Sequence, residues 1–97
     1  MRTWEESLHE RLAASEEYAV GYLSAALEEN HTPTFLLALR HVAEARGGLD
    51  ALAQKTGFDQ TSLDRLLSGI GTPQLDSLQE ILAALGIQIT FTVKKAA

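Results

Sequence analysis

The chain of 97 residues carries a formal net charge of −5 at pH 7, contains 45% hydrophobic and 22% charged residues, and lacks cysteine. This length suits one domain with a single modest core, and the composition excludes an intrinsically disordered chain. Disulfides and thiolate metal sites are excluded, and no apolar run approaches the roughly 20 residues that span a bilayer. Since the first residues also lack an apolar stretch of the signal-peptide type, we expect a cytoplasmic protein that does not associate with membranes.

The negative charge is confined to one end of the chain. Residues 1–31 hold seven glutamates and two arginines, which account for the whole net charge, whereas residues 32–97 hold six acidic and six basic residues. A dedicated nucleic-acid binder is usually basic, because phosphate contacts supply most of its affinity. The acidic segment therefore counts against strong DNA binding by a monomer and indicates a basic protein partner.

Residues 1–31 form the first of three predicted parts, an acidic helical region that supports the rest or binds a partner. Thr3, followed three residues later by Glu6, predicts the start of a helix with a capping box. Ser15 predicts the start of a second helix, which ends near residue 29 or 30. Trp4 has two interpretations, an anchor that packs in the core or an interface residue, because aromatic residues are enriched in both.

Residues 32–86 form the predicted main domain. Thr32 as a helix cap and Pro33 in the first turn predict the helix that follows. A broad apolar face makes this helix central to the core and consists of Phe35, Leu36, Leu39, Val42 and Ala43. Arg40 and Glu44 have the spacing of an exposed ion pair on its outer side.

The chain from residue 49 to residue 68 reads as a short helix, a tight turn and a second short helix. Gly57 provides the left-handed conformation at the turn, and Asp59 caps the second helix. The inward-facing residues of that helix are Leu63, Leu66 and Leu67. This spacing is typical of a helix-turn-helix, in which the second helix enters the major groove of DNA. The alternative is a helical hairpin that only contributes to an all-α core.

The outward side of this segment carries hydrogen-bonding side chains of a size that fits a DNA groove. Gln60 has the donor and the acceptor that read adenine, and Arg65 can read guanine or contact a phosphate. Asp64 also faces outward and would repel the polyanion. We expect the DNA-binding residues to be Lys55, Gln60, Thr61, Ser62, Arg65, Ser68 and Thr72.

The spacing of apolar residues changes from helical to strand-like at Gly86. Before it, a helix over residues 75–85 is predicted, with inward-facing Leu75, Leu78, Ile81, Leu82 and Leu85. In the third part, residues 87–97, apolar and polar residues alternate as in a half-buried strand. Because a lone strand leaves its backbone unpaired, we expect antiparallel pairing with a second copy. The homodimer interface would then consist of Ile87, Ile89, Phe91 and Val93. The alternative is an extended tail laid on the core.

Recognisable catalytic motifs are missing from the sequence. The three histidines, His9, His31 and His41, lie on separate segments without the spacing of metal ligands. The glycine-containing segment GIGTP lacks the lysine and hydroxyl residue of a phosphate-binding loop. We therefore expect a protein that is not an enzyme and that has neither a catalytic site, a metal site nor a cofactor.

Five segments together resemble a known family: YLSAALEE, LALRHVAEARGG, LAQKTGF, LLSGIGTP and ILAALGI. They are similar to addiction-module antidote proteins, the HigA-type antitoxins of the Xre (Cro/CI-repressor-like) helix-turn-helix family, over roughly residues 17–92. The resemblance implies an all-α Xre/lambda-repressor-like domain of five to six helices that forms a homodimer. It also implies binding to a palindromic operator in double-stranded DNA, repression of the protein's own operon and neutralisation of a RelE/HigB-like toxin.

The sequence departs from this family in the recognition segment and the loop after it. Asp64 stands where the family often has an aromatic residue, Ile70 where it often has lysine, and Thr72 where it often has asparagine. Positive charge that would attract DNA is thereby reduced. The alternative function is a protein-interaction module that binds a basic toxin through its acidic N-terminal region, with weak or no DNA binding.

Overall fold

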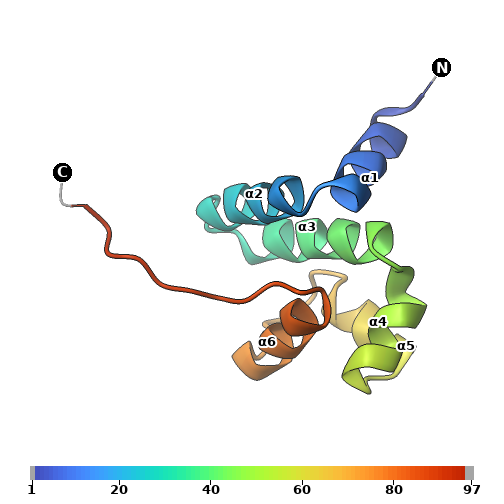
Figure 1. Cartoon of the computed structure of the whole chain (residues 1–97). Coiled ribbons are helices and arrows are strands. Elements are labelled where there is room, and N and C mark those ends of the chain that lie inside the picture. Colours follow the sequence, from blue (N-terminus) through green and yellow to red (C-terminus); the bar gives the residue numbers. More distant parts are fainter. Residues whose placement is uncertain (1, 96–97) are drawn as a thin grey trace.

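The computed structural model describes residues 2–95, and this part of the chain contains six α-helices and no β-strand. In chain order they are α1 (Trp4–Ala14), α2 (Glu16–Glu28), α3 (Thr32–Ala45), α4 (Gly48–Thr56), α5 (Gln60–Leu66) and α6 (Leu75–Ala84) (Figure 1). The expected all-α architecture of five to six helices is confirmed, whereas the predicted C-terminal strand is not observed. None of the helices described is both long and apolar enough to cross a bilayer.

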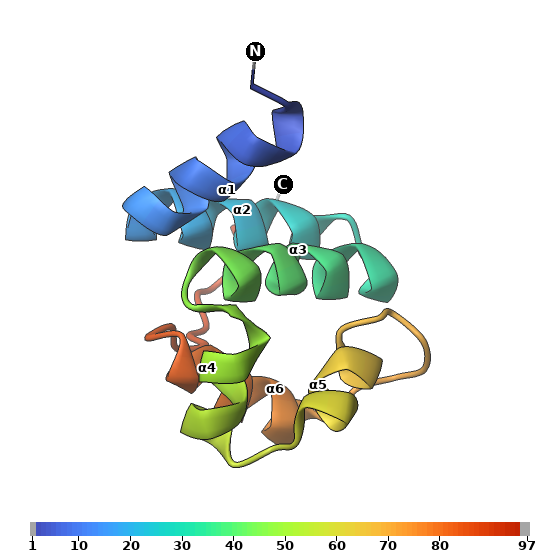
Figure 2. The same cartoon turned by 90° about the vertical axis from the view of Figure 1, so that its right-hand side faces the viewer.

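The first two helices begin at the caps predicted from the sequence. Thr3 Oγ1 accepts a hydrogen bond from the Glu6 N–H at 3.1 Å, and Ser15 Oγ accepts one from the Tyr18 N–H at 3.0 Å. Both α1 and α2 pack against α3, as the two views show (Figures 1 and 2). Their buried residues, Leu8, Leu12, Ala19 and Leu23, join one core with residues of α3 to α6.

Helix α3 lies between the α1–α2 pair and the remaining helices and provides the centre of the core (Figure 2). Its buried residues are Leu36, Ala38, Leu39, Val42 and Ala43. The predicted cap is wrong by one residue, because Thr32 is already helical and His31, with extended backbone, is the N-cap. The side chain of His31 makes no cap hydrogen bond to the backbone, and its Nδ1 lies 2.8 Å from Thr34 Oγ1 instead.

A tight turn joins α4 to α5. Gly57 ends α4 with φ of +81°, a conformation that a Cβ would penalise. Asp59 then caps α5, and its carboxylate accepts a hydrogen bond from the Ser62 N–H at 2.7 Å. Leu63 is buried and packs α5 against the core. The turn at Gly57 and the cap at Asp59 predicted from the sequence are confirmed, and the pair of helices is compatible with a helix-turn-helix.

The last helix packs against α4 through its second half, where Ile81 and Leu82 are buried. Leu75 was expected to face inward, but 63% of it is exposed. It is the first residue of α6, at the end that points away from α4 (Figure 1). Helical spacing therefore identified the correct face of α6 but not how far the packing extends along it.

After α6 the chain is extended and runs away from the helical body (Figure 1). We call residues 87–95 the C-terminal arm. Ile87 packs against the core, whereas Ile89, Phe91 and Val93 are 41%, 93% and 95% exposed. The arm is not a strand in this single chain because a strand is defined by a hydrogen-bonded neighbour, and no other described segment lies beside it as one. Of the alternative interpretation, the extended tail is observed, but only its beginning, at Ile87, packs on the core.

Candidate nucleic-acid interface

All seven side chains expected to contact DNA are exposed, namely Lys55, Gln60, Thr61, Ser62, Arg65, Ser68 and Thr72. Five of them lie on α5 or directly after it. Lys55 lies in a hollow with Ala13 and Leu85, which no residue of α5 lines. Thr72 lines a hollow beside His31 at the start of α3. The structure thus groups five of the residues on or after α5, whereas Lys55 and Thr72 line hollows formed with other helices.

Gln60, at the start of α5, is hydrogen-bonded to α4. Its Nε2 donates to the Asp50 carboxylate, which sequence analysis had not singled out. The two residues are ten positions apart on different helices, so no helical spacing rule pairs them. Their contact orients the Gln60 amide and adds a carboxylate to the surface around α5.

Asp59 remains ionised at the N-terminus of α5. The hydrogen bond from the Ser62 backbone, with further contributions from the Ser62 side chain and the charge of Arg65, lowers the pKa of Asp59 below its ordinary value of 3.8. The carboxylate therefore serves the helix as a cap and also places a negative charge beside Ser62.

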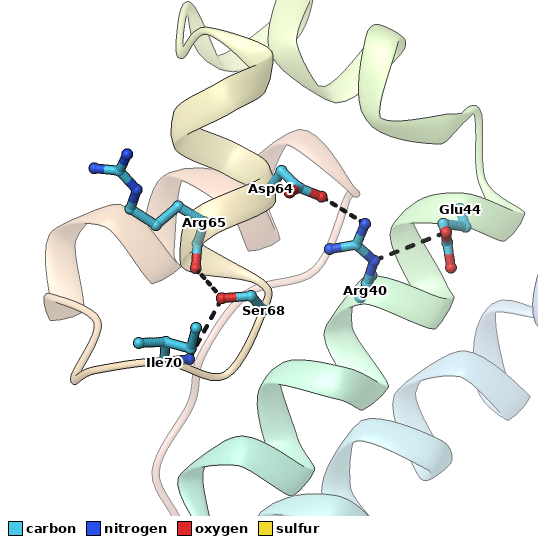
Figure 3. A network of polar contacts seen from close by, with 6 residues as sticks. All are labelled: Arg40, Glu44, Asp64, Arg65, Ser68 and Ile70. Carbon is cyan, nitrogen blue, oxygen red and sulfur yellow. Dashed lines mark hydrogen bonds and ion pairs between the residues drawn. The ribbon is translucent and has the colours of Figure 1, made fainter.

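Asp64 has a partner that the sequence did not reveal. Arg40 Nη2 donates to Asp64 Oδ1 at 2.6 Å, whereas Arg40 Nε lies 3.9 Å from Glu44 Oε2 (Figure 3). The expected Arg40–Glu44 pair is present, but the contact with Asp64 is the shorter one. Arg40 therefore compensates the charge of Asp64 and connects α3 to α5.

The side chains of Arg65 and Ser68, at the end of α5, differ in their contacts. Ser68 Oγ donates to the carbonyl of Arg65 at 2.6 Å and accepts from the Ile70 N–H at 3.4 Å (Figure 3). The Arg65 guanidinium extends away from the helices, on a different side of α5 from Asp64 (Figure 3). Arg65 is thus available to a ligand, while the Ser68 hydroxyl is engaged in ending the helix.

Charges of both signs lie on α5 and on the side chains that touch it. The carboxylates belong to Asp50, Asp59 and Asp64, and the cations belong to Arg40 and Arg65. This surface is therefore not basic. Any binding of DNA by a single copy would depend on hydrogen bonds from α5 more than on charge.

Two of the three histidines, His31 and His41, make local hydrogen bonds. His41 Nδ1 is hydrogen-bonded to the Tyr22 hydroxyl at 2.7 Å, and burial raises the pKa of Tyr22, with a smaller effect from Tyr18. Within residues 2–95, no group of three or more potential ligand side chains is arranged to bind a metal ion.

The fold and this surface define an all-helical protein with a tightly turned helix pair, compatible with the helix-turn-helix class. The profile of a family described as "Probable addiction module antidote protein" matches residues 6–93. A protein of Haemophilus influenzae described as "Uncharacterized protein" is 32% identical over 79 residues, which are 81% of this chain and 79% of that protein. No solved structure matches the chain. The chain therefore belongs to the addiction module antidote family.

Proposed function

We propose that this antidote protein is a HigA-type antitoxin of a type II toxin–antitoxin module and a repressor of its own operon. It acts by binding, without catalysis and without a cofactor. The observation that supports DNA binding best is the exposed face of α5, which is held by the turn at Gly57 and presents Gln60, Thr61 and Arg65. Side chains of these types on a short helix after such a turn match the Xre type of helix-turn-helix.

The proposed repressor is a homodimer on a palindromic operator. Two α5 helices related by a two-fold axis would enter adjacent major grooves about 34 Å apart. The C-terminal arm provides the contact, because pairing with a second copy would cover Phe91 and Val93, which are 93% and 95% exposed. A dimer would also make twice as many hydrogen bonds from α5 to DNA as one copy, which matters because the surface around α5 is not basic.

The proposed protein partner is a basic, RelE/HigB-like ribonuclease toxin. Membership of an antidote family implies a toxin in general. The net charge of −5 within residues 1–31 supports a basic one, since complementary charge speeds association and selects partners.

A second candidate function is that of a protein-interaction module that has weak or no affinity for DNA. The three carboxylates around α5, those of Asp50, Asp59 and Asp64, favour this candidate. If this second function is correct, α4 and α5 would serve as a scaffold and the acidic N-terminal region would still bind the toxin.

An electrophoretic shift of the DNA upstream of the gene distinguishes the two functions. We expect a salt-sensitive shift by the protein alone and a further change when the product of the adjacent gene is added. A scrambled DNA of the same length is the control. If the protein alone causes no shift even at low salt, the repressor function is wrong and the interaction module is favoured.

A further inference from the structure

A hollow of about 190 Å³ lies between α1 and α3. Its apolar floor is Leu8, which is 8% exposed, and Leu12, which is 0% exposed, is fully buried behind it. Trp4 borders the hollow at the start of α1. Glu5 contributes a carboxylate from α1 and Glu44 contributes one from α3. Sites for small molecules are usually larger, about 300–1,000 Å³, so this hollow suits a single side chain.

Trp4 does not act as an anchor in the core. It is 67% exposed, and the neighbouring Leu8 and Leu12 hold α1 on α3 without it. A large exposed aromatic residue is typical of the centre of a protein interface. Of the two interpretations drawn from the sequence, exposure therefore favours the interface residue.

The carboxylates at this hollow are weakly compensated. Glu5 makes no ion pair within the described part of the chain, and Glu44 lies 3.9 Å from Arg40, whose shorter contact is with Asp64. Glu5 belongs to the N-terminal segment, residues 1–31, whose net charge is −5, and Glu44 lines the same hollow from α3. An aromatic face, an apolar floor and two carboxylates together are complementary to a long cationic side chain.

We infer that this hollow binds an arginine or lysine side chain that protrudes from a basic protein partner. The methylene groups lie on Leu8, the cation lies against the face of Trp4, and Glu5 and Glu44 accept its hydrogen bonds. Arginine fits better than lysine, because its planar guanidinium stacks on an aromatic ring and donates to two carboxylates at once. This inference rests on the proposed antidote role, since the partner is the toxin.

The test measures the affinity of the full-length chain for the product of the adjacent gene by calorimetry. Trp4→Ala is expected to weaken the complex about 30-fold, as loss of a central aromatic residue does, while Trp4→Phe keeps most of the affinity. The double variant Glu5→Gln, Glu44→Gln should weaken it at least about tenfold. The matched control, Glu28→Gln with Glu29→Gln, removes the same charge from exposed positions outside the hollow. Equal losses in the two double variants would overturn the inference.

A second measurement locates the contact directly. The chain contains one tryptophan, so fluorotryptophan labelling gives a single ¹⁹F resonance, that of Trp4. We expect this resonance to shift when the adjacent gene product is added. A complex that forms while the resonance stays unchanged overturns the binding hollow but leaves the antidote role intact. If no complex forms, the antidote role is overturned together with the inference.

Discussion

The guanidinium of Arg40 on α3 lies 2.6 Å from the Asp64 carboxylate on α5, and this ion pair connects the centre of the core to the candidate recognition helix (Figure 3). The side chain of Arg40 is 26% exposed and that of Asp64 is 61% exposed. Exposed ion pairs typically contribute about 0–1 kcal/mol to folding. The main effect of this pair is therefore on the charge of the surface, because each residue neutralises the other.

Replacing Asp64 is expected to strengthen DNA binding. Asp64→Asn removes a negative charge from α5 and leaves Arg40 free to approach a phosphate, while the free energy of unfolding falls by less than about 1 kcal/mol. Fluorescence anisotropy with the upstream DNA, at several salt concentrations, measures the affinity. Asp76→Asn, on the exposed first turn of α6, is the matched control. A lower affinity in the Asp64 variant than in this control would contradict the expectation.

Removing the free cation of α5 should have the opposite effect. Arg65→Ala is expected to weaken operator binding by about 1–3 kcal/mol if the guanidinium contacts a base, and to leave folding unchanged because the side chain is exposed. The same anisotropy titration measures this loss. Arg2→Ala removes an exposed arginine from the other end of the chain and serves as control. Equal affinity in wild type and the Arg65 variant would exclude Arg65 as a DNA contact.

The C-terminal arm should determine the oligomeric state. Phe91→Ser combined with Val93→Ser removes two side chains that are 93% and 95% exposed in the single chain, so the fold should be unaffected. Full burial of such side chains contributes about 1.5–3 kcal/mol each, and its loss should convert a dimer into monomers. Light scattering after size exclusion measures the mass. Leu27→Ser, at an apolar position of α2 that is 61% exposed, should remain dimeric.

Two glycine substitutions should change stability in opposite directions. Gly57→Ala places a Cβ at φ of +81° and should destabilise the fold by about 1–2 kcal/mol, although the space around it is open. Gly21→Ala lies within α2, where an added Cβ also meets nothing within 4 Å, and should stabilise by about 0.5–1 kcal/mol. Urea unfolding gives both values. A neutral Gly57→Ala would show that the turn does not require its left-handed conformation.

The contribution of Asp59 to stability should depend on pH. Because folding lowers its pKa below 3.8, the ionised carboxylate stabilises the folded state above that value, and this contribution is lost as pH falls through the lowered pKa. Thermal melts of wild type and Asp59→Ala, from neutral pH to well below pH 3.8, should therefore converge at the acidic end. Melting curves that stay equally far apart at every pH would show that the charge of Asp59 plays no part.

Local features of the fold were predictable from the sequence, because each depends on residues close together in the chain. The caps at Thr3, Ser15 and Asp59 and the turn at Gly57 follow from one or two residues with strong conformational preferences. The buried faces of α3 and α6 follow from helical spacing.

Contacts between helices were not predictable in the same way. The partners of Asp64 and Gln60 are 24 and 10 residues away, and only the packing of α3, α4 and α5 brings them together. The hollow that Lys55 shares with Ala13 and Leu85 likewise depends on packing between distant segments. The strand predicted at residues 87–93 is not observed in the single chain for a related reason, since alternating apolar residues indicate an extended segment but do not provide its neighbour.

The most direct measurement is growth of cells that express the adjacent gene, with and without this chain. The account predicts that the adjacent gene alone arrests growth and that the wild-type chain restores it. Arg65→Ala should restore growth as well, because α5 is distinct from the acidic N-terminal region that is proposed to bind the toxin. An adjacent gene that does not arrest growth, or an arrest that the wild-type chain fails to relieve, would contradict the antidote function.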